Sequence, residues 1–186
     1  MTIYIGLIIV CWIVFLLYWV YASFGIERTP GQRHAARGIW LRVLAVVILL
    51  GILHIEPLRS ITYYRFTNPV IDGLGVILCV LGVAFAISAR RHLGMNWGLP
   101  MEVKENPTLI TSGPYSLVRH PIYTGVIFAT FGSMLAGGLI WSVPFIVFLF
   151  YFMRSANVEE KMLLKQFPDA YPAYQAHTKW LIPYVW

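Results

Sequence analysis

The stretch Ile122–Met153, IYTGVIFATFGSMLAGGLIWSVPFIVFLFYFM, decides the fold because none of its 32 residues is charged. A single helix of that length would measure about 48 Å, well beyond the ~30 Å hydrocarbon core of a bilayer. The adjacent Gly137 and Gly138 near its middle predict a break. We therefore expect two helices, at about 122–137 and 139–154, that form a hairpin.

Three further apolar stretches precede this one, at Ile3–Phe24, Ile39–Ile55 and Pro69–Ala89. Ile3–Phe24 has neither a basic start nor a small-residue cleavage site, so we expect a membrane anchor rather than a signal peptide. The chain of 186 residues is 59% hydrophobic and only 12% charged, about half the charged fraction of a soluble domain. We predict one all-α integral membrane domain, residues 1–186, with about five transmembrane helices.

The basic residues test this arrangement. With five spans and the N-terminus outside, twelve of the fourteen Lys and Arg residues fall on the cytoplasmic side, and only Arg59 and Arg65 fall outside. The net charge of +6 is then explained by topology and by attraction to anionic membrane lipid, so nucleic acid is not an expected partner. The small size of the chain favours a prokaryotic inner membrane.

The predicted topology divides the chain into two parts. Residues 1–89 would form three N-terminal spans, and residues 90–186 a cytoplasmic loop, the hairpin and a C-terminal helical tail. A hairpin brings its two ends together, which would place Arg119 and His120 near the region of Arg154 and the tail. Glu159 and Glu160 follow on that tail, and adjacent side chains on a helix point about 100° apart. We expect only one of these two carboxylates to face inward.

The segment Ser112–Gly125 combines turn formers, two tyrosines, an Arg and a His beside an apolar run. Each residue also has a purely structural explanation: Arg119 can mark the end of a span, His120 can bond the turn, and Gly125 can allow close helix packing. Their occurrence within fourteen residues, together with a diacidic pair on the tail, favours a binding site. The two cysteines lie in apolar spans, which favours packing roles over a disulfide or a metal site.

The pattern Gly113-Pro114-Tyr115-x-x-Val118-Arg119-His120-Pro121-x-Tyr123-x-Gly125 resembles the signature of the isoprenylcysteine carboxyl methyltransferase family and related membrane methyltransferases. Glu159-Glu160-x-x-Leu163-x-x-x-Phe167-Pro168-x-x-Tyr171-x-x-Tyr174, closing with Ile182-Pro183, and the earlier Arg91-His92-Leu93-Gly94-x-x-Trp97 are similar to further family segments. The resemblance covers about residues 88–186. The stretch Asn106–Thr111 departs from the family pattern.

The resemblance implies a methyltransferase that uses S-adenosyl-L-methionine at a cytoplasm-facing site, on a lipophilic or lipidated acceptor such as an isoprenylcysteine carboxylate or a lipid amine. Arg119 would grip the cofactor carboxylate, a Glu would take the ammonium or ribose, and Tyr115, Tyr123 or Trp97 would pack on adenine. No metal is implied. The catalytic candidates are Arg119, Glu159 and Glu160, and the cofactor-binding candidates are Leu109, Gly113, Tyr115, Val118, Arg119, His120, Tyr123 and Glu160.

Two other functions stay open at this point. A membrane reductase of the sterol-reductase type would bind NADPH and use a proton donor, usually a Tyr. A non-catalytic membrane protein would keep the fold without binding a ligand. A soluble dinucleotide-binding domain is not expected, because the sequence has no Gly-x-Gly-x-x-Gly after a strand. A carboxylate acceptor would need no general base, whereas an amine could use His120 or a Glu.

Overall fold

The computed structural model describes residues 2–23, 68–94 and 108–183, and these residues are helical apart from turns and one isolated β-bridge. The predicted span Ile39–Ile55 and Trp97 lie outside the described residues. The elements in chain order are α1 (Thr2–Ser23), α4 (Pro69–Leu93), the 3-10 turn η2 (Gly113–Ser116), α5 (Pro121–Gly137), the 3-10 turn η3 (Leu139–Trp141), α6 (Ser142–Gln166) and α7 (Ala170–His177).

The helices have the surface of a membrane protein. Three apolar segments, Ile3–Ala22, Pro69–Leu93 and Leu139–Gln166, are long and apolar enough to cross a bilayer, and α5 is a shorter apolar helix. Large apolar side chains point outward, such as Leu17 at 64% and Phe150 at 67% exposure. Such a surface is stable in hydrocarbon and costly in water. The chain is an integral membrane protein, while the number of spans and the membrane hairpin stay predictions.

The helices α4 and α5 pack closely along a seam of small residues. A Cβ atom built on Gly82 would lie 2.5 Å from the carbonyl oxygen of Gly125, and one built on Gly75 would lie 2.6 Å from that of Gly132. Real Cβ atoms do not approach that closely, so the two backbones touch where side chains are missing. The pairing of residue 75 with 132 and of 82 with 125 shows that the helices run antiparallel. Gly125 therefore fixes the first turns of α5 against α4.

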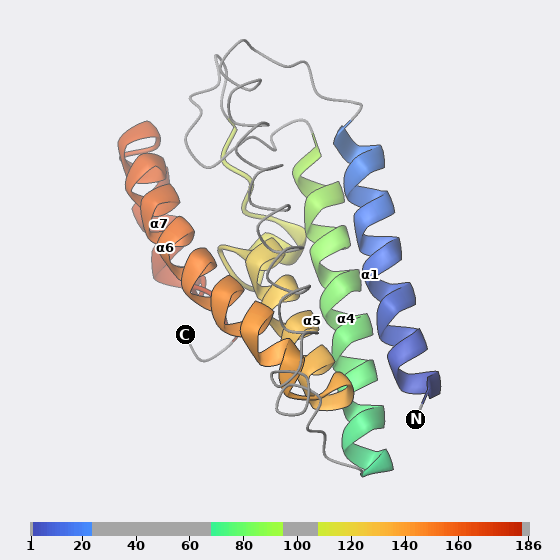
Figure 1. Cartoon of the computed structure of the whole chain (residues 1–186). Coiled ribbons are helices and arrows are strands. Elements are labelled where there is room, and N and C mark those ends of the chain that lie inside the picture. The colour runs from blue at the N-terminus through green and yellow to red at the C-terminus, as the bar shows by residue number, and fades with distance from the viewer. Residues whose placement is uncertain (1, 24–67, 95–107, 184–186) are drawn as a thin grey trace.

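Helix α1 lies beside α4 in the same layer (Figure 1). The indole of Trp12 donates a hydrogen bond of 3.0 Å to Ser133 on α5, and its ring stacks on Trp141 at 5.9 Å. At the C-terminal end of α1, the guanidinium of Arg90 donates a bond of 3.2 Å to the carbonyl of Ala22. This bond satisfies one of the free carbonyls at the C-terminus of α1, so α1 is attached to the bundle at its middle and at its C-terminal end.

The long apolar stretch breaks where the sequence predicts. Helix α5 ends at Gly137, and Gly138 follows with a φ of 94°, a conformation that favours glycine. Beyond it, α6 runs antiparallel to α5, since Phe131 lies beside Phe145 and Tyr123 stacks on Phe152. The helix α6 starts at Ser142 and continues to Gln166, well past the predicted end at residue 154, because after Pro144 in its first turn no Gly or Pro follows until Pro168.

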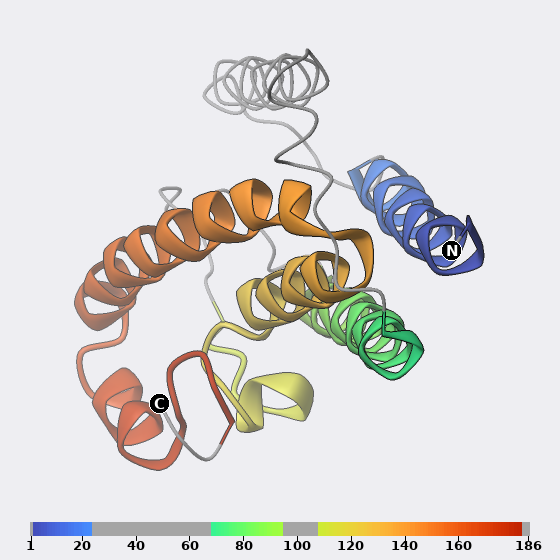
Figure 2. The same ribbon diagram turned by 60° about the horizontal axis from the view of Figure 1, so that its bottom comes forward.

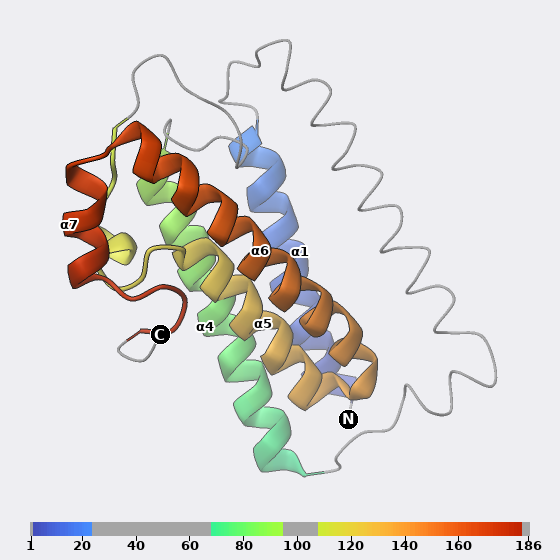
Figure 3. The same cartoon turned by 90° about the vertical axis from the view of Figure 1, so that its left-hand side faces the viewer.

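The C-terminal part gathers at one end of the bundle. Figure 2 and Figure 3 show α7 and the chain after it beside η2, the yellow turn before α5. Three separate segments of the sequence meet there: the loop that enters α5, the last turns of α6, and the tail. This end contains nearly all of the polar residues predicted for the site.

Candidate functional site

The turn before α5 is shaped by Gly113. Its φ of 62° is one that side chains rarely adopt, and a Cβ atom would lie 2.7 Å from the imidazole of His92. His92 in turn bonds the Ser112 hydroxyl at 2.9 Å. Pro121 then begins α5, at a position where its missing N–H costs nothing. The turn is thereby held against the end of α4, and it presents residues 115–123 to the tail.

The tail pairs with this turn through its backbone. Arg119 N–H donates to the carbonyl of Lys179 at 2.8 Å, and His120 N–H donates to that of Trp180 at 3.3 Å. The buried Thr124 hydroxyl donates to the carbonyl of the next tail residue, Leu181, at 2.6 Å. Three consecutive tail carbonyls are thus used by the residues of the motif. The tail is part of the site rather than an appendage.

Four charged side chains meet where α6 passes the turn. The Arg119 Nε donates to Glu160 Oε1 at 2.6 Å, and Arg119 Nη1 also donates to the carbonyl of Thr178. The His120 ring lies between both glutamates, with Nδ1 at 3.4 Å from Glu159 and Nε2 at 3.3 Å from Glu160. We call Arg119, His120, Glu159 and Glu160 the charged cluster. Two cations and two anions balance one another there.

The His120 environment favours its protonated form. The side chain is only 3% exposed, and burial by itself lowers the pKa of His120. Hydrogen bonds and charge from Glu159 and Glu160 outweigh that effect, so the pKa of His120 lies above its usual range. With a carboxylate oxygen facing each ring nitrogen, only the imidazolium can donate to both.

Both glutamates take part in the cluster, which corrects the expectation that only one would face inward. Glu159 accepts a bond of 3.1 Å from the Tyr123 hydroxyl, and Glu160 accepts one of 3.1 Å from the Gln175 amide. The physical reason is that the partners surround α6: α5 and its preceding turn supply some of them, and α7 supplies Gln175. A 100° separation on the helix therefore still leaves both carboxylates with polar neighbours.

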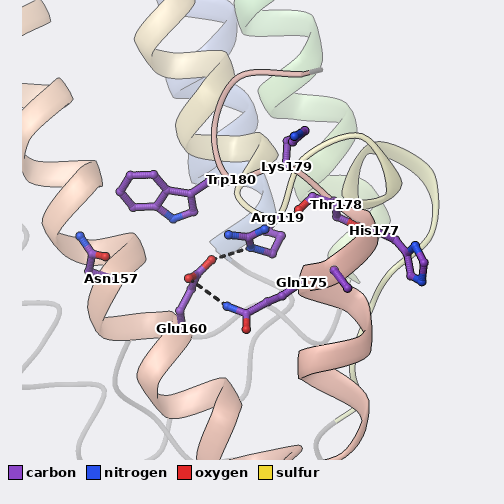
Figure 4. Close-up of a pocket in the computed structure, with 9 residues that line it drawn as sticks. Arg119, Asn157, Glu160, Gln175, His177, Thr178, Lys179 and Trp180 are labelled. Atoms are coloured by element: carbon purple, nitrogen blue, oxygen red, sulfur yellow. Dashed lines mark hydrogen bonds and ion pairs between the residues drawn. The ribbon is translucent and has the colours of Figure 1, made fainter. Parts of the chain in front are cut away.

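A polar cavity of about 460 Å³ lies on the Glu160 side of the cluster. Figure 4 shows Arg119 between Glu160 of α6 and the tail, with Gln175 reaching Glu160 from α7. We call this space the tail cavity, because most of its wall comes from α7 and the chain after it. It is lined by Arg119, Asn157, Glu160, Gln175, Ala176, His177, Thr178, Lys179 and Trp180.

A second cavity of about 160 Å³ lies on the Glu159 side. Four tyrosines contribute to its wall, and we call it the tyrosine cavity. Arg119 lines both cavities, so the charged cluster forms a wall that they share. The tyrosine cavity is lined by Leu93, Leu109, Ile110, Tyr115, Arg119, His120, Pro121, Ile122, Tyr123, Glu159, Leu163, Tyr171 and Tyr174.

The structure brings five of the predicted cofactor-binding residues to the tyrosine cavity: Leu109, Tyr115, Arg119, His120 and Tyr123. The other three are placed elsewhere. Glu160 faces the tail cavity. Val118 is fully buried and forms the β-bridge with Lys179. Gly113 packs on His92, so its place in the motif is explained by backbone conformation and close contact.

The three tyrosines of the tyrosine cavity that lie outside the apolar helices stay neutral. Burial raises the pKa of Tyr115, and the negative charge of Glu159 adds to this effect. Burial likewise raises the pKa of Tyr171 and of Tyr174. Each is therefore a protonated phenol at neutral pH, with an aromatic face able to attract a cation.

Several residues of the site were not predicted from the sequence as site residues. Tyr171 and Tyr174 lie on α7 and line the tyrosine cavity, and the hydroxyl of Tyr174 donates to the carbonyl of Tyr115 at 2.5 Å. Their spacing of three residues places both on one face of a helix, which is a signal that the sequence does contain. Gln175 and Thr178 have no such signal, because their roles arise from where the tail folds back.

The described residues contain no group of three His, Cys, Asp or Glu side chains placed to hold a metal ion. Cys11 and Cys79 are both free thiols. The polar chemistry of the described residues is thus concentrated in the charged cluster and its two cavities.

A bundle of apolar helices with a buried charged cluster at one end defines a class: integral membrane proteins with a polar site at one end of the helices. The family described as Phospholipid methyltransferase matches residues 71–170, which is more than half of the chain. The chain belongs to this family. The match includes α5, α6 and all four members of the charged cluster.

Individual relatives agree with the resemblance to isoprenylcysteine carboxyl methyltransferases. The methanethiol S-methyltransferase of a Pseudomonas species is 30% identical over 154 residues, which cover 76% of this chain and 58% of that enzyme. The protein-S-isoprenylcysteine O-methyltransferase of Tribolium castaneum is 27% identical over 167 residues, which cover 88% of this chain and 55% of that enzyme. The chain spans about half the length of the curated relatives it matches.

The fold also matches a solved structure. The eukaryotic intramembrane Ras methyltransferase, an isoprenylcysteine carboxyl methyltransferase, superposes with a TM-score of 0.55 at 24% sequence identity. The match covers 88% of this chain and 56% of that one. At this identity the likeness establishes a shared helical membrane fold.

Proposed function

We propose that this protein is a membrane-embedded methyltransferase that uses S-adenosyl-L-methionine and acts on a lipophilic acceptor. The observation that carries the proposal is the charged cluster of Arg119, His120, Glu159 and Glu160, which forms the shared wall of a polar and an aromatic cavity. This arrangement occurs in a chain whose family and named relatives include methyltransferases.

The residues around the two cavities suit the chemistry of the donor. When bound, S-adenosyl-L-methionine supplies an electrophilic methyl group on a sulfonium, and the carbon–sulfur electron pair leaves with the sulfur. The neutral tyrosine faces of the tyrosine cavity can stabilise a sulfonium and stack on an adenine. The tail cavity offers Lys179 for a carboxylate and Glu160 for an ammonium. Together the cavities provide an acceptor or donor for each polar part of that molecule.

The charged cluster acts mainly by positioning. The expected role of Arg119 as a clamp for the donor carboxylate changes, because its Nε and Nη1 already bond Glu160 and the tail. In our proposal Arg119 and His120 hold the two glutamates and the tail in place, and Glu159 and Glu160 face the ligand. A preorganised site contributes to rate by holding the reacting atoms in line, an effect worth about 7–11 kcal/mol when orientation is ideal.

A lipophilic acceptor has a separate route. A groove of about 730 Å³ lies between α1 and α4 and is lined mostly by apolar residues such as Val14, Val83 and Ile87. Its polar end carries Arg91 and His92. His92 contacts the turn that begins the motif, and its neighbour Leu93 lines the tyrosine cavity. We propose that an acceptor chain enters sideways along this groove and reaches the site from its polar end.

The nucleophile decides whether a base is needed. A carboxylate, as in an isoprenylated cysteine, attacks the methyl carbon directly. An amine must first be deprotonated, and Glu159, which is the more exposed carboxylate of the pair, is the group we propose for that task. His120 is unsuited to it because both ring nitrogens already face carboxylates.

We further propose that the site faces the cytoplasm of a prokaryotic inner membrane, as the positive-inside distribution predicts. The test is labelling of a single cysteine at Lys179→Cys, in a background without Cys11 and Cys79. A membrane-impermeant reagent applied from outside intact cells should leave this position unlabelled. Labelling from outside would refute the proposed orientation and the five-span topology.

The activity itself is tested by transfer of a radiolabelled methyl group from S-adenosyl-L-methionine to bacterial membrane lipids and to a farnesylated cysteine analogue. We expect organic-extractable label with the wild-type protein and little with Glu159→Gln. An equal signal from both proteins would contradict the role of the cluster. Oxidation of NADPH with a sterol-like alkene, in place of methyl transfer, would favour a reductase.

A further inference from the structure

Tyr171 has a hydroxyl group with no hydrogen-bond partner in the described part of the chain. The residue lies in the first turn of α7, is fully buried at 0% exposure, and contributes to the wall of the tyrosine cavity. Its hydroxyl oxygen is buried and has no hydrogen-bond partner among the described residues. Two other tyrosines of the same cavity differ: Tyr123 donates to Glu159, and Tyr174 donates to the carbonyl of Tyr115.

An unpartnered hydroxyl in such a position is unfavourable for the protein alone. A buried polar group without a partner costs about 1–3 kcal/mol, and native proteins rarely keep one without a function. The packing of Tyr171 does not require the oxygen, since its ring contacts Tyr174 edge to face at a centroid distance of 5.9 Å. Phenylalanine would make the same contact without the cost. The hydroxyl is therefore unexplained by the fold.

The neighbouring acceptors are already engaged. Glu159 accepts from Tyr123 and lies beside His120, and Glu160 accepts from Arg119 and Gln175. These bonds direct the carboxylates toward other donors. Since no described residue accepts from Tyr171, we take the acceptor to be a molecule that occupies the tyrosine cavity.

We propose that Tyr171 is a ligand-binding residue whose hydroxyl donates a hydrogen bond to an oxygen or nitrogen of the bound methyl donor. This inference rests on the proposed function. The donor is the partner we favour because Tyr171 lies on α7, at the polar end of the bundle, and the lipophilic acceptor would approach along α1 and α4. The ribose hydroxyls and adenine nitrogens of the donor are suitable acceptors.

The test compares Tyr171→Phe with Tyr174→Phe in the purified full chain. Both changes remove one hydroxyl from α7, but of the two only the Tyr174 hydroxyl has a partner among the residues that the structure describes. We measure thermal unfolding without ligand and the Kd of S-adenosylhomocysteine by calorimetry. Tyr171→Phe should leave the ligand-free Tm unchanged or higher and raise the Kd about five- to tenfold, as expected for one lost hydrogen bond. Tyr174→Phe should lower the ligand-free Tm.

Two results would overturn the inference while the proposed function stands: wild-type affinity in Tyr171→Phe, or a loss of ligand-free stability in that variant as large as in Tyr174→Phe. The second result would mean that the hydroxyl has a structural partner. Failure of the wild-type protein to bind S-adenosylhomocysteine would overturn the proposed function and the inference with it. The wild-type titration thus separates the two kinds of failure.

Discussion

Helix α5 is held by opposite means along its length and at its first turn. Along most of its length α5 meets α4 at glycines, where the backbones touch because side chains are missing. At its first turn it meets α6 and the tail through a charged cluster and three backbone or hydroxyl bonds to tail carbonyls. The apolar seam positions the helix, and the polar end positions the ligand groups. The fold is thus specified in the membrane by shape, and at its boundary by hydrogen bonds and charge.

The seam should respond most strongly to added volume. Gly82→Leu places a side chain where even a Cβ atom would lie 2.5 Å from the Gly125 carbonyl, so α4 and α5 must separate. We expect the free energy of unfolding to fall by about 3 kcal/mol or more, enough to prevent recovery of folded protein. Gly73→Leu on the same helix is the control, because no atom lies within 4 Å of its Cβ position. Size-exclusion profiles in detergent report the outcome, and equal profiles for the two variants would argue against the seam.

The charged cluster should respond strongly to the loss of one charge. Glu160→Gln removes one of the two negative charges beside Arg119 and His120. The side chains of Arg119, His120 and Glu160 are only 3–16% exposed, so water cannot replace that charge well. We expect a destabilisation of about 2–3 kcal/mol together with weaker ligand binding. Asp169→Asn, at an exposed carboxylate, should change neither quantity. Equal effects on Tm from the two changes would mean that the cluster is no more than a solvated helix face.

A change of pH should perturb the charged cluster more mildly than a substitution, through the protonation of His120. Because the pKa of His120 is raised in the folded state, its charge contributes full stability below the ~6.5 of an unfolded histidine, and this contribution is lost as the pH rises through the folded pKa. The Tm of the wild type should fall between pH 6.5 and 9 more steeply than that of His120→Gln. Parallel pH profiles for the two proteins would show that His120 is not a charged member of the cluster.

The smallest effect is expected from the tail alone. Thr124→Val removes the hydrogen bond to the Leu181 carbonyl and should lower the free energy of unfolding by about 1 kcal/mol. We expect this loss mainly to loosen the attachment of the tail. Thr130→Val is a matched control, since the Thr130 hydroxyl bonds only carbonyls of its own helix. Limited proteolysis should cut the C-terminal segment faster in the first variant than in the second. Identical cleavage rates would mean that Thr124 does not hold the tail.

The contrast between the apolar seam and the polar end of α5 also explains what could be predicted from the sequence. Local signals predicted the helix break at Gly137 and Gly138 and a helix over about residues 122–137, because turn residues act over short distances. The number of spans is still a prediction. The pairing of Val118 with Lys179 and the contact of Gln175 with Glu160 could not be predicted, since no local pattern encodes which separate segments the fold brings together.

The two glutamates show the limit most clearly. A helical wheel separates Glu159 from Glu160 by about 100° and assigns only one to the interior. The structure supplies polar partners over a wider arc than a single helix face, from Tyr123 on one side to Gln175 on the other. Pattern analysis of one helix cannot include partners that tertiary folding brings in. Those partners distinguish a binding site from a solvated helix face.

The central claim is that the charged cluster and its two cavities bind the methyl donor. The most direct measurement is calorimetric titration of the purified, folded protein with S-adenosyl-L-methionine, S-adenosylhomocysteine and NADPH. We predict micromolar binding of the first two and none of the third, with weaker binding in Glu160→Gln. Binding of NADPH alone, or of none of the three by a protein that unfolds cooperatively on heating, would contradict the account.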